Sequence, residues 1–202
     1  MFELILASAS PRRLGLLQDL GFEVSCKPQN IDETPHQGEA PEALVKRLAL
    51  EKARSALGSL DPRDQRMVLG SDTIVLCEEQ ILGKPVDKEA ACAMLRLLSG
   101  RQHHVITAVA LLDHQREAVD LSKTAVNFKE LSDEEIERYW ETGEPADKAG
   151  AYAIQGLGGM FISGISGSYS GVVGLPVYET VRLLAQFNLD TSSILKSCHE
   201  RN

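Results

Sequence analysis

Apolar and polar positions along the chain predict an alternating series of strands and helices. The predicted strands, in which apolar residues run together, are 2–7, 67–69, 74–76, 105–112 and about 118–128. The predicted helices, in which apolar residues recur every three or four positions, are 11–20, 41–57, 88–99, 133–143 and 176–187. This mixed order, without an internal repeat or an obvious linker, is typical of an α/β protein with a curved sheet flanked by helices. Polar residues dominate after Leu189 and predict a C-terminal tail over residues 190–202.

Three helix starts follow from end signals as well as from periodicity. Ser10 and Pro11 supply an N-cap and a first helical position. Asp87 precedes another helical pattern and is a suitable cap, and Ser132 and Glu135 have the spacing of a capping box. These residues predict where each helix begins.

The charge balance narrows the classes of partner. The chain has 29 acidic and 21 basic residues, which gives a formal net charge of -8. A general nucleic-acid binder holds phosphates with an excess of Lys and Arg, so this class is disfavoured, and any anionic ligand must meet a local group of cations. The N-terminus begins in a predicted strand without a basic n-region, and no apolar run reaches about 18 residues. We therefore expect a cytoplasmic protein that has no membrane or nucleic-acid partner.

Residues 8–13, Ser-Ala-Ser-Pro-Arg-Arg, lie where the first predicted strand ends and the first predicted helix begins. Free backbone N–H groups, the hydroxyls of Ser8 and Ser10, and the guanidinium groups of Arg12 and Arg13 converge there, and such a place suits a phosphate. A plain helix N-cap followed by two solvated arginines is the alternative. Positive charge in a first helical turn opposes the helix dipole, and this unfavourable placement favours an anion site.

Asp72 lies in Gly-Ser-Asp-Thr, residues 70–73, which separates two apolar strand segments. A carboxylate in this setting must be partnered in the interior or face a cleft, because burying a lone charge is costly. One interpretation is a turn in which Asp72 bonds to its own backbone. The other is a metal ligand or general base whose ionisation is set by neighbouring cations and a bound ion.

Two lysines and a second carboxylate can each be explained either by a role in a site or by an ordinary structural role. Lys84 lies between a glycine and a proline, which fix its backbone, although this is also the composition of an ordinary turn. Lys52 falls on the margin of the apolar face of helix 41–57, where its stem could also snorkel outward. Glu33 lies in a loop, where solvated charge is the usual explanation. Glu33 and Asp72 could share a magnesium ion with a phosphate chain, since that ion prefers oxygen ligands.

Glycine-rich stretches dominate the last third of the chain, at residues 149–156, 167–169 and 172–176. Tight turns between strands would explain them. Gln155, however, is an isolated amide among apolar residues, and an amide can both donate to and accept from the edge of a base.

Together these segments resemble the Maf family of nucleotide pyrophosphatases over about residues 2–188. The motifs are Ser-x-Ser-Pro-Arg-Arg at 8–13, Gly-Ser-Asp-Thr at 70–73, Gly-Lys-Pro at 83–85, Ala-Gly-Ala-Tyr-x-Ile-Gln-Gly at 149–156 and Gly-Leu-Pro at 174–176. Each motif alone is modest, but their order and spacing are specific. The resemblance implies one catalytic domain over residues 1–189, with an elongated twisted mixed sheet and two lobes around a cleft, as in inosine triphosphatase-like proteins. It also implies that a homodimer is common.

The resemblance further implies attack of water at the α-phosphorus of a nucleoside triphosphate, with release of pyrophosphate. It gives catalytic roles to Asp72, Glu33, Lys52 and Lys84, with Asp72 as general base. Glu33 and Asp72 would contact a divalent cation, Mg²⁺ or Mn²⁺. The substrate-binding residues that it implies are Ser8, Ser10, Arg12, Arg13, Thr73 and Gln155.

The nucleobase of the substrate is predicted from the same resemblance. The tract around Gln155 is similar to the branch that acts on UTP and dTTP, in which the positions of Arg12, Thr73 and Gln155 are linked to base choice. Modified pyrimidine nucleotides are further candidate substrates. Gly83 replaces an acidic residue that some members have before Lys-Pro, which is a local departure from the pattern.

Two alternatives stay open at this point. A sister branch of the family acts on 7-methyl-GTP and has a different sequence in the Gln155 tract, which speaks against that substrate. A non-catalytic, nucleotide-sensing regulator of cell division is the other alternative. The complete set of Asp72, Glu33, Lys52 and Lys84 argues against a purely binding role.

Overall fold

The computed structural model describes residues 2–199 and divides into two compact units, each built from separate stretches of chain. Unit 1 contains the chain up to Asp72, Thr107–Ser122 and the chain from Gly174, and unit 2 contains Thr73–Ile106 and Lys123–Val173. The strands that contribute residues to both units are β3 (Met67–Cys77), β5 (Gln102–Leu112) and β6 (Glu117–Phe128). The strand order of the seven-stranded sheet is β2-β1-β3-β5-β6-β7, and β4 pairs with β3.

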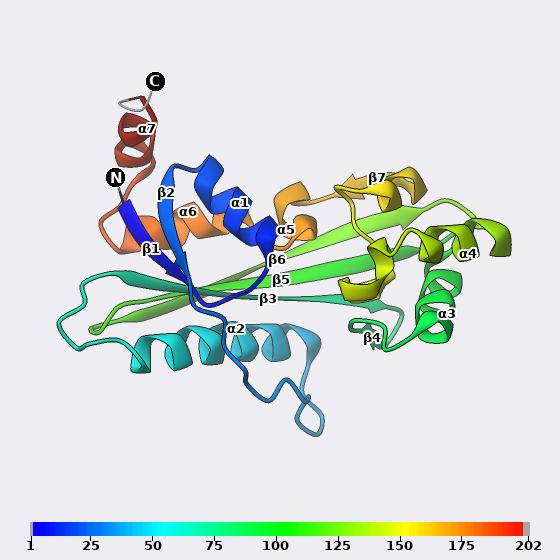
Figure 1. Cartoon of the computed structure of the whole chain (residues 1–202), viewed down its shortest axis with the longest axis horizontal. Coiled ribbons are helices and arrows are strands. Elements are labelled where there is room, and N and C mark those ends of the chain that lie inside the picture. The colour runs from blue at the N-terminus through cyan, green and yellow to red at the C-terminus, as the bar shows by residue number, and fades with distance from the viewer. Residues whose placement is uncertain (1, 200–202) are drawn as a thin grey trace. The chain divides into compact units, whose positions relative to one another are not determined.

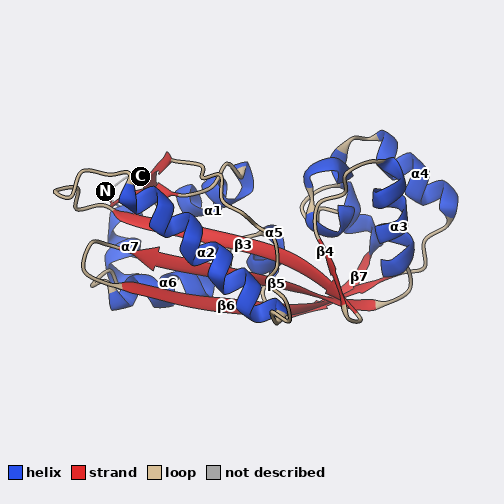
Figure 2. Cartoon of the chain, turned by 90° about the horizontal axis from the view of Figure 1, so that it is seen from below, coloured by secondary structure: helices blue, strands red, loops and turns tan. Residues whose placement is uncertain are grey.

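Unit 1 contains parallel strand pairs and has helices on both faces. Strand β1 (Phe2–Leu6) pairs in parallel with β2 (Phe22–Cys26) and with β3. Helix α2 (Pro41–Gly58) covers one face, and α1 (Pro11–Asp19) and α6 (Val177–Gln186) cover the other (Figures 1 and 2). A core cluster of this unit joins apolar residues of α1, α6 and strands β1, β2, β3 and β5, including Leu4, Leu6, Leu17, Phe22, Leu69, Val109, Leu111, Leu183 and Leu184.

Unit 2 is built on antiparallel pairs. Strand β4 (Gln80–Leu82) pairs with β3, and β7 (Ile162–Ser166) pairs with β6. Helices α3 (Lys88–Leu98) and α4 (Asp133–Glu141) lie side by side (Figure 2). The short helices are η1 (Glu144–Asp147), η2 (Ala149–Ala151), η3 (Leu157–Phe161) and α5 (Tyr169–Val173). The core combines aliphatic residues with an aromatic group of Phe128, Tyr139, Tyr152 and Phe161.

The mixed α/β class predicted from the sequence is confirmed, and so are three helix starts. Ser10 caps α1, Asp87 caps α3, and Ser132 and Glu135 form a complete capping box at α4. None of the helices within residues 2–199 has the length and apolar character needed to cross a membrane.

The predicted break between two strand segments at residues 70–73 is wrong, because β3 is continuous from Met67 to Cys77. A Cβ atom at Gly70 would lie 2.1 Å from the carbonyl oxygen of Ala49 in α2, so the glycine allows helix and strand to pack closely. Ser71 and Asp72 are buried and have hydrogen-bond partners. Polar residues therefore occupy the strand without ending it.

The C-terminal segment also differs from its prediction. Helix α7 spans Thr191–His199, where the sequence predicted a tail from residue 190. Ile194 is buried and belongs to the core of unit 1, which explains why the segment is helical and packed. Residues 200–202 of the predicted tail lie outside the described residues.

A buried histidine lies at the start of β5. His103 is only 1% exposed, its Nε2 atom is 2.8 Å from the Tyr152 hydroxyl, and its ring packs edge-on against Phe128 and Tyr152. Burial, with a smaller contribution from His104, lowers the pKa of His103 from 6.5 to about 4. The imidazole is therefore neutral in the folded protein at neutral pH.

This shift predicts a loss of stability in mild acid. Below pH 6.5 the unfolded chain binds a proton at His103 that the folded chain accepts only below about pH 4, so stability falls as pH decreases through this window. We expect the free energy of unfolding to drop by about 2 kcal/mol between about pH 7.5 and pH 5. Urea unfolding should show a smaller drop in His103→Gln, whereas the neighbouring control His104→Gln should keep it. An equal drop in wild type and His103→Gln would refute this origin.

Candidate active site

The first turn of α1 gathers the polar groups of residues 8–13. Ser10 is the N-cap, its Oγ accepts from the backbone N–H of Arg13 at 3.5 Å, and Pro11 follows as the first helical residue. The Oγ atom of Ser8 accepts from the N–H of Ser10 at 3.2 Å and from Nη1 of Arg13 at 3.1 Å. Ser8 is buried, and Arg12 and Arg13 are half-buried. The two hydroxyls and the Arg13 guanidinium therefore converge at one place.

Arg13 is held by the protein and is not a solvated arginine. Its Nε donates to the carbonyl oxygen of Gly174 at 2.8 Å, and the hydroxyl of Ser71 donates to the same oxygen at 3.1 Å. Burial lowers the pKa of Arg13, whereas the charge of Asp72 opposes that shift. The Gly174 carbonyl thus links α1, β3 and the segment before α6. The sequence indicated nothing of this carbonyl beyond a turn glycine.

Lys52 joins two carboxylates from different elements. Its Nζ atom lies 2.7 Å from Oδ1 of Asp72 on β3 and 2.5 Å from Oε1 of Glu33 in the loop before α2. Lys52 is 9% exposed and Asp72 is 7% exposed, whereas the Glu33 side chain is 58% exposed. The snorkelling interpretation of Lys52 and the turn interpretation of Asp72 are therefore both wrong. One side of this cluster is buried, and the Glu33 side reaches solvent.

The local charges have opposing effects on Asp72. Burial raises the pKa of its carboxyl, and the charge of Glu33 acts in the same direction. Lys52 and Arg13 lower the pKa and offset part of that shift, and the net direction is upward. A carboxyl group with a raised pKa is a stronger base than an ordinary aspartate, which suits proton abstraction.

The carboxylates of this cluster fit a hard divalent cation. Among the residues that the structure describes, no three His, Cys, Asp or Glu side chains are grouped closely enough to hold a metal by themselves. Mg²⁺ is usually held by one or two carboxylates together with substrate phosphates and water, and not by a closed protein cage. Asp72 and Glu33, whose Oδ1 and Oε1 atoms share Lys52, supply two such carboxylates.

The remaining predicted site residues belong to unit 2. Thr73 follows Asp72 on β3 and is half-buried, and Lys84 is exposed just after β4. Gln155 lies between η2 and η3 and is exposed, so the predicted apolar setting does not enclose it. Within unit 2 the structure joins two of the motifs: the backbone N–H of Gly150 donates to the carbonyl oxygen of Gly83 at 3.0 Å.

The backbone at position 150 favours a glycine. Its φ is +68°, and a Cβ atom there would lie 3.0 Å from Cγ2 of Val75 in the core. The glycine therefore allows the segment before Gln155 to pack on β3 while its N–H supports the loop that carries Lys84.

Comparison with known proteins agrees with the motifs. The family described as Maf-like protein matches residues 3–187. A protein of Pseudoalteromonas atlantica named dTTP/UTP pyrophosphatase is 50% identical over 92% of this chain and 97% of its own length. A protein of Shewanella oneidensis with the same name is 52% identical over 91% of this chain and 97% of its own length.

Among solved structures, the Ham1 protein of Staphylococcus aureus is a distant likeness. It covers 62% of this chain and 71% of its own, with 14% identity and a TM-score of 0.47. The match to the family over nearly the whole sequence, together with relatives at about half identity, shows that this chain belongs to the Maf family.

Proposed function

We propose that this protein hydrolyses UTP and dTTP to the nucleoside monophosphate and pyrophosphate. The relatives that share half of its sequence are named dTTP/UTP pyrophosphatases. The observation that carries the proposal is the Lys52 ammonium held between Asp72 and Glu33, because it combines a buried carboxylate base with a neighbouring cation. Such a pair suits hydrolysis of a phosphoanhydride, whereas simple nucleotide binding does not need a buried base.

Asp72 is the general base in this proposal. Its carboxylate accepts a proton from water as the water oxygen forms a bond to the α-phosphorus. The bond from the α-phosphorus to the bridging oxygen breaks, and its electron pair leaves with pyrophosphate. The raised pKa of Asp72 strengthens it as a base, while the charge of Lys52 and its hydrogen bond oppose that rise and favour the ionised form.

Basic residues balance the charge of the triphosphate. Arg12, Lys52 and Lys84 are the proposed cations that offset charge developing on the leaving pyrophosphate. Ser8, Ser10 and the first-turn N–H groups of α1 offer hydrogen-bond donors of the kind that bind phosphates at helix N-termini. Arg13 already bonds to Ser8 and Gly174, so its part is to shape this turn as well as to supply charge.

A bound Mg²⁺ or Mn²⁺ would polarise the phosphate chain and help to neutralise it. Asp72 and Glu33 are the residues proposed to hold this cation. Arg12, Thr73 and Gln155 are proposed to select the base, with the Gln155 amide as the group that can donate and accept at a pyrimidine edge.

Pyrophosphate release from a panel of nucleotides tests this function. UTP, dTTP, CTP, GTP and 7-methyl-GTP should be compared with Mg²⁺ and with Mn²⁺, and without either metal. We expect metal-dependent turnover of UTP and dTTP above the others. Preference for 7-methyl-GTP would overturn the pyrimidine assignment, and binding without turnover of any nucleotide would favour the regulator.

Removal of Lys52 should change the pH dependence of this reaction. Because Lys52 lowers the pKa of Asp72, Lys52→Gln should raise that pKa further, so that the basic form is lost at a higher pH. The acid limb of the kcat profile should therefore move to higher pH. Lys46→Gln, a substitution in the same helix outside the cluster, is the control. An unmoved acid limb in Lys52→Gln would show that Asp72 does not control it.

A further inference from the structure

Two side chains of unit 2 that the reaction does not use hold the loop that carries Gln155. The hydroxyl of Tyr139, near the end of α4, accepts from the backbone N–H of Ala153 at 3.2 Å. The carboxylate of Glu144, at the start of η1, accepts from the N–H of Leu157 and the N–H of Gly158, both at 2.9 Å. The loop is therefore anchored on both sides of Gln155.

The two anchors are themselves joined. The Tyr139 hydroxyl donates to Oε1 of Glu144 at 2.6 Å, and the Tyr139 ring packs edge-on against Phe161 with ring centroids 4.9 Å apart. Tyr139 is only 3% exposed, so its ring is fixed by the core of unit 2. The Tyr139 hydroxyl and the Glu144 carboxylate therefore fix the loop to the core of unit 2.

Glycines allow the loop to approach these groups. A Cβ atom at Gly156 would lie 2.1 Å from Oε2 of Glu144, and one at Gly158 would lie 2.6 Å from the Tyr139 hydroxyl oxygen. Gly156 also donates its N–H to the carbonyl oxygen of Ala153 at 3.2 Å, which closes a turn around Gln155. Glycine at these two positions therefore leaves room for the carboxylate and the hydroxyl that anchor the loop.

The ionisation states suit these contacts. Burial raises the pKa of Glu144, but hydrogen bonds from Tyr139, Gly158 and Leu157 outweigh it and the net shift is downward. Burial and the bond to Glu144 raise the pKa of Tyr139. At neutral pH the carboxylate is therefore ionised and accepts hydrogen bonds, while the hydroxyl keeps its proton and donates it. Hydrogen bonds to an ionised acceptor are among the stronger ones in proteins.

The side chain of Gln155 is not fixed by a hydrogen bond of its own within the described residues. The residue is exposed, and within the described part of the chain its side-chain amide has no hydrogen-bond partner. An amide that recognises a nucleobase binds it more tightly when its loop is already ordered, because binding then does not have to offset the conformational entropy lost on ordering the loop.

We propose that Tyr139 and Glu144 are positioning residues for base selection: they hold the turn at Ala153–Gly156 so that the Gln155 amide is presented to the pyrimidine. This inference rests on the proposed function, in which Gln155 contacts the base. Neither residue is proposed to touch the reacting atoms. Their removal should therefore affect nucleotide affinity and base choice and leave the chemical step nearly unchanged.

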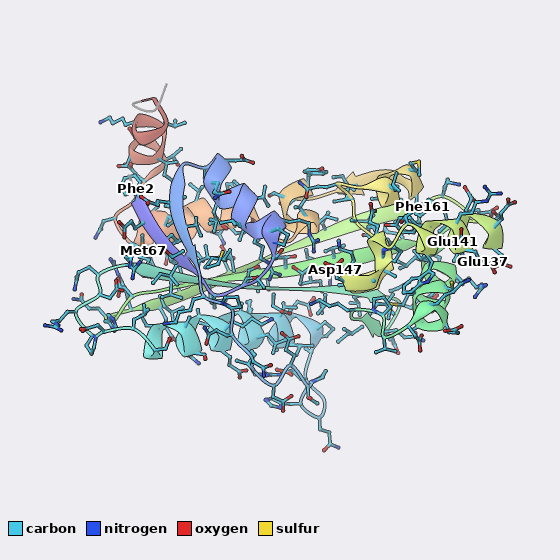
Figure 3. The ribbon with its side chains drawn as sticks, in the orientation of Figure 1. Phe2, Met67, Glu137, Glu141, Asp147 and Phe161 are labelled. Carbon is cyan, nitrogen blue, oxygen red and sulfur yellow. The ribbon has the colours of Figure 1, made fainter. Side chains whose placement is uncertain are left out.

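Conservative variants test this role. Tyr139→Phe keeps the ring and removes the hydroxyl, and Glu144→Gln keeps the shape and removes one acceptor for the loop. Each should raise KM for UTP and dTTP by about 3- to 10-fold, the effect of losing one or two such hydrogen bonds. The kcat should stay within about 2-fold of wild type, and the preference for UTP over CTP should fall. Glu141→Gln, an exposed substitution on the same helix (Figure 3), should leave KM unchanged.

A double-mutant cycle with Gln155→Ala distinguishes positioning from a general loss of structure. If both anchors act through Gln155, Tyr139→Phe should raise KM in the wild-type background and have almost no effect in Gln155→Ala. Thermal melting of every variant establishes that it is folded. Additive effects, or an unchanged KM in folded Tyr139→Phe and Glu144→Gln, would overturn the positioning role.

The same cycle separates this inference from the proposed function. Wild-type pyrophosphate release reports on the function alone. Affinity for UTP, measured by calorimetry in an Asp72→Asn background, gives the cycle without any turnover. Coupling between Tyr139 and Gln155 in that binding experiment supports the positioning role whatever the reaction, and its absence overturns the role even where wild type is active.

Discussion

Replacement of Asp72 by Asn should lower kcat for UTP and dTTP by about 10²- to 10⁴-fold, the range expected for loss of a general base. The amide has nearly the same shape as the carboxylate but cannot take a proton from water. Lys52 keeps Glu33 as an ionic partner, at 2.5 Å, so the variant does not leave a buried lysine without a counter-charge. Pyrophosphate release at saturating nucleotide and metal measures the effect on the chemical step.

Asp113→Asn is a matched control for this variant. Asp113 is also an ion-paired aspartate of unit 1, bonded to Arg116 outside the Lys52 cluster, so its substitution should leave kcat within about 2-fold. Folded Asp72→Asn protein with turnover close to wild type would remove Asp72 from the role of base. If a thermal melt shows that Asp72→Asn is unfolded at the assay temperature, its kcat should be measured at a lower temperature at which it is folded.

Gly70→Ala should destabilise the protein by about 3 kcal/mol or more, at the upper end of the range for overpacked sites. The added methyl group would lie 2.1 Å from the carbonyl oxygen of Ala49 and 3.0 Å from the backbone nitrogen of Ala53. Both atoms belong to the backbone of α2, which cannot rotate away as a flexible side chain would. Relief would require α2 to move off β3, and Lys52 of α2 would move from Asp72 with it.

Gly15→Ala, also in unit 1, should change the free energy of unfolding in the opposite direction. Gly15 lies inside α1, and a Cβ atom there meets nothing within 4 Å. Replacing a helical glycine by alanine should therefore stabilise the fold by about 0.5–1 kcal/mol. Urea denaturation of both variants measures the contrast. Equal stability of Gly70→Ala and wild type would show that α2 is not packed on β3 as closely as described.

Much of unit 1 and its site could be predicted from the sequence because the signals are local. Ser10 and Pro11 mark the helix start that gathers the hydroxyls and Arg13, since capping needs only neighbouring residues. Asp72 could be singled out because a carboxylate within an apolar stretch needs a partner. The sequence does not show which residue that partner is, because the packing of distant segments brings it to Asp72. Only the structure places the Lys52 ammonium on Asp72 and joins Glu33 to the same ammonium.

The errors have a common physical cause, which is tertiary contact overriding a local signal. Residues 70–73 contain turn-forming types, yet they continue β3 because Gly70 accommodates α2 and Asp72 finds Lys52. Helix α7 forms within the polar stretch because Ile194 packs in the core of unit 1. Propensity alone is a weak guide in both places.

Tyr139 and Glu144 were also outside the reach of sequence reasoning. Tyr139 has the spacing of a core residue in an amphipathic helix, and Glu144 lies in a short Gly-Glu-Pro stretch that is typical of a turn. Their hydrogen bonds reach residues more than ten positions away, at Ala153, Leu157 and Gly158. The glycines beside Gln155 were explained by tight turns between strands, and the structure shows that two of them also face Glu144 and Tyr139 closely.

Hydrolysis of UTP in ¹⁸O-labelled water, with mass spectrometry of both products, tests most directly whether water attacks the α-phosphorus. Attack of water at the α-phosphorus predicts UMP that carries one ¹⁸O atom and pyrophosphate that carries none. Label in pyrophosphate, or formation of UDP and inorganic phosphate, would place the attack at another phosphorus and contradict hydrolysis at the α-phosphorus.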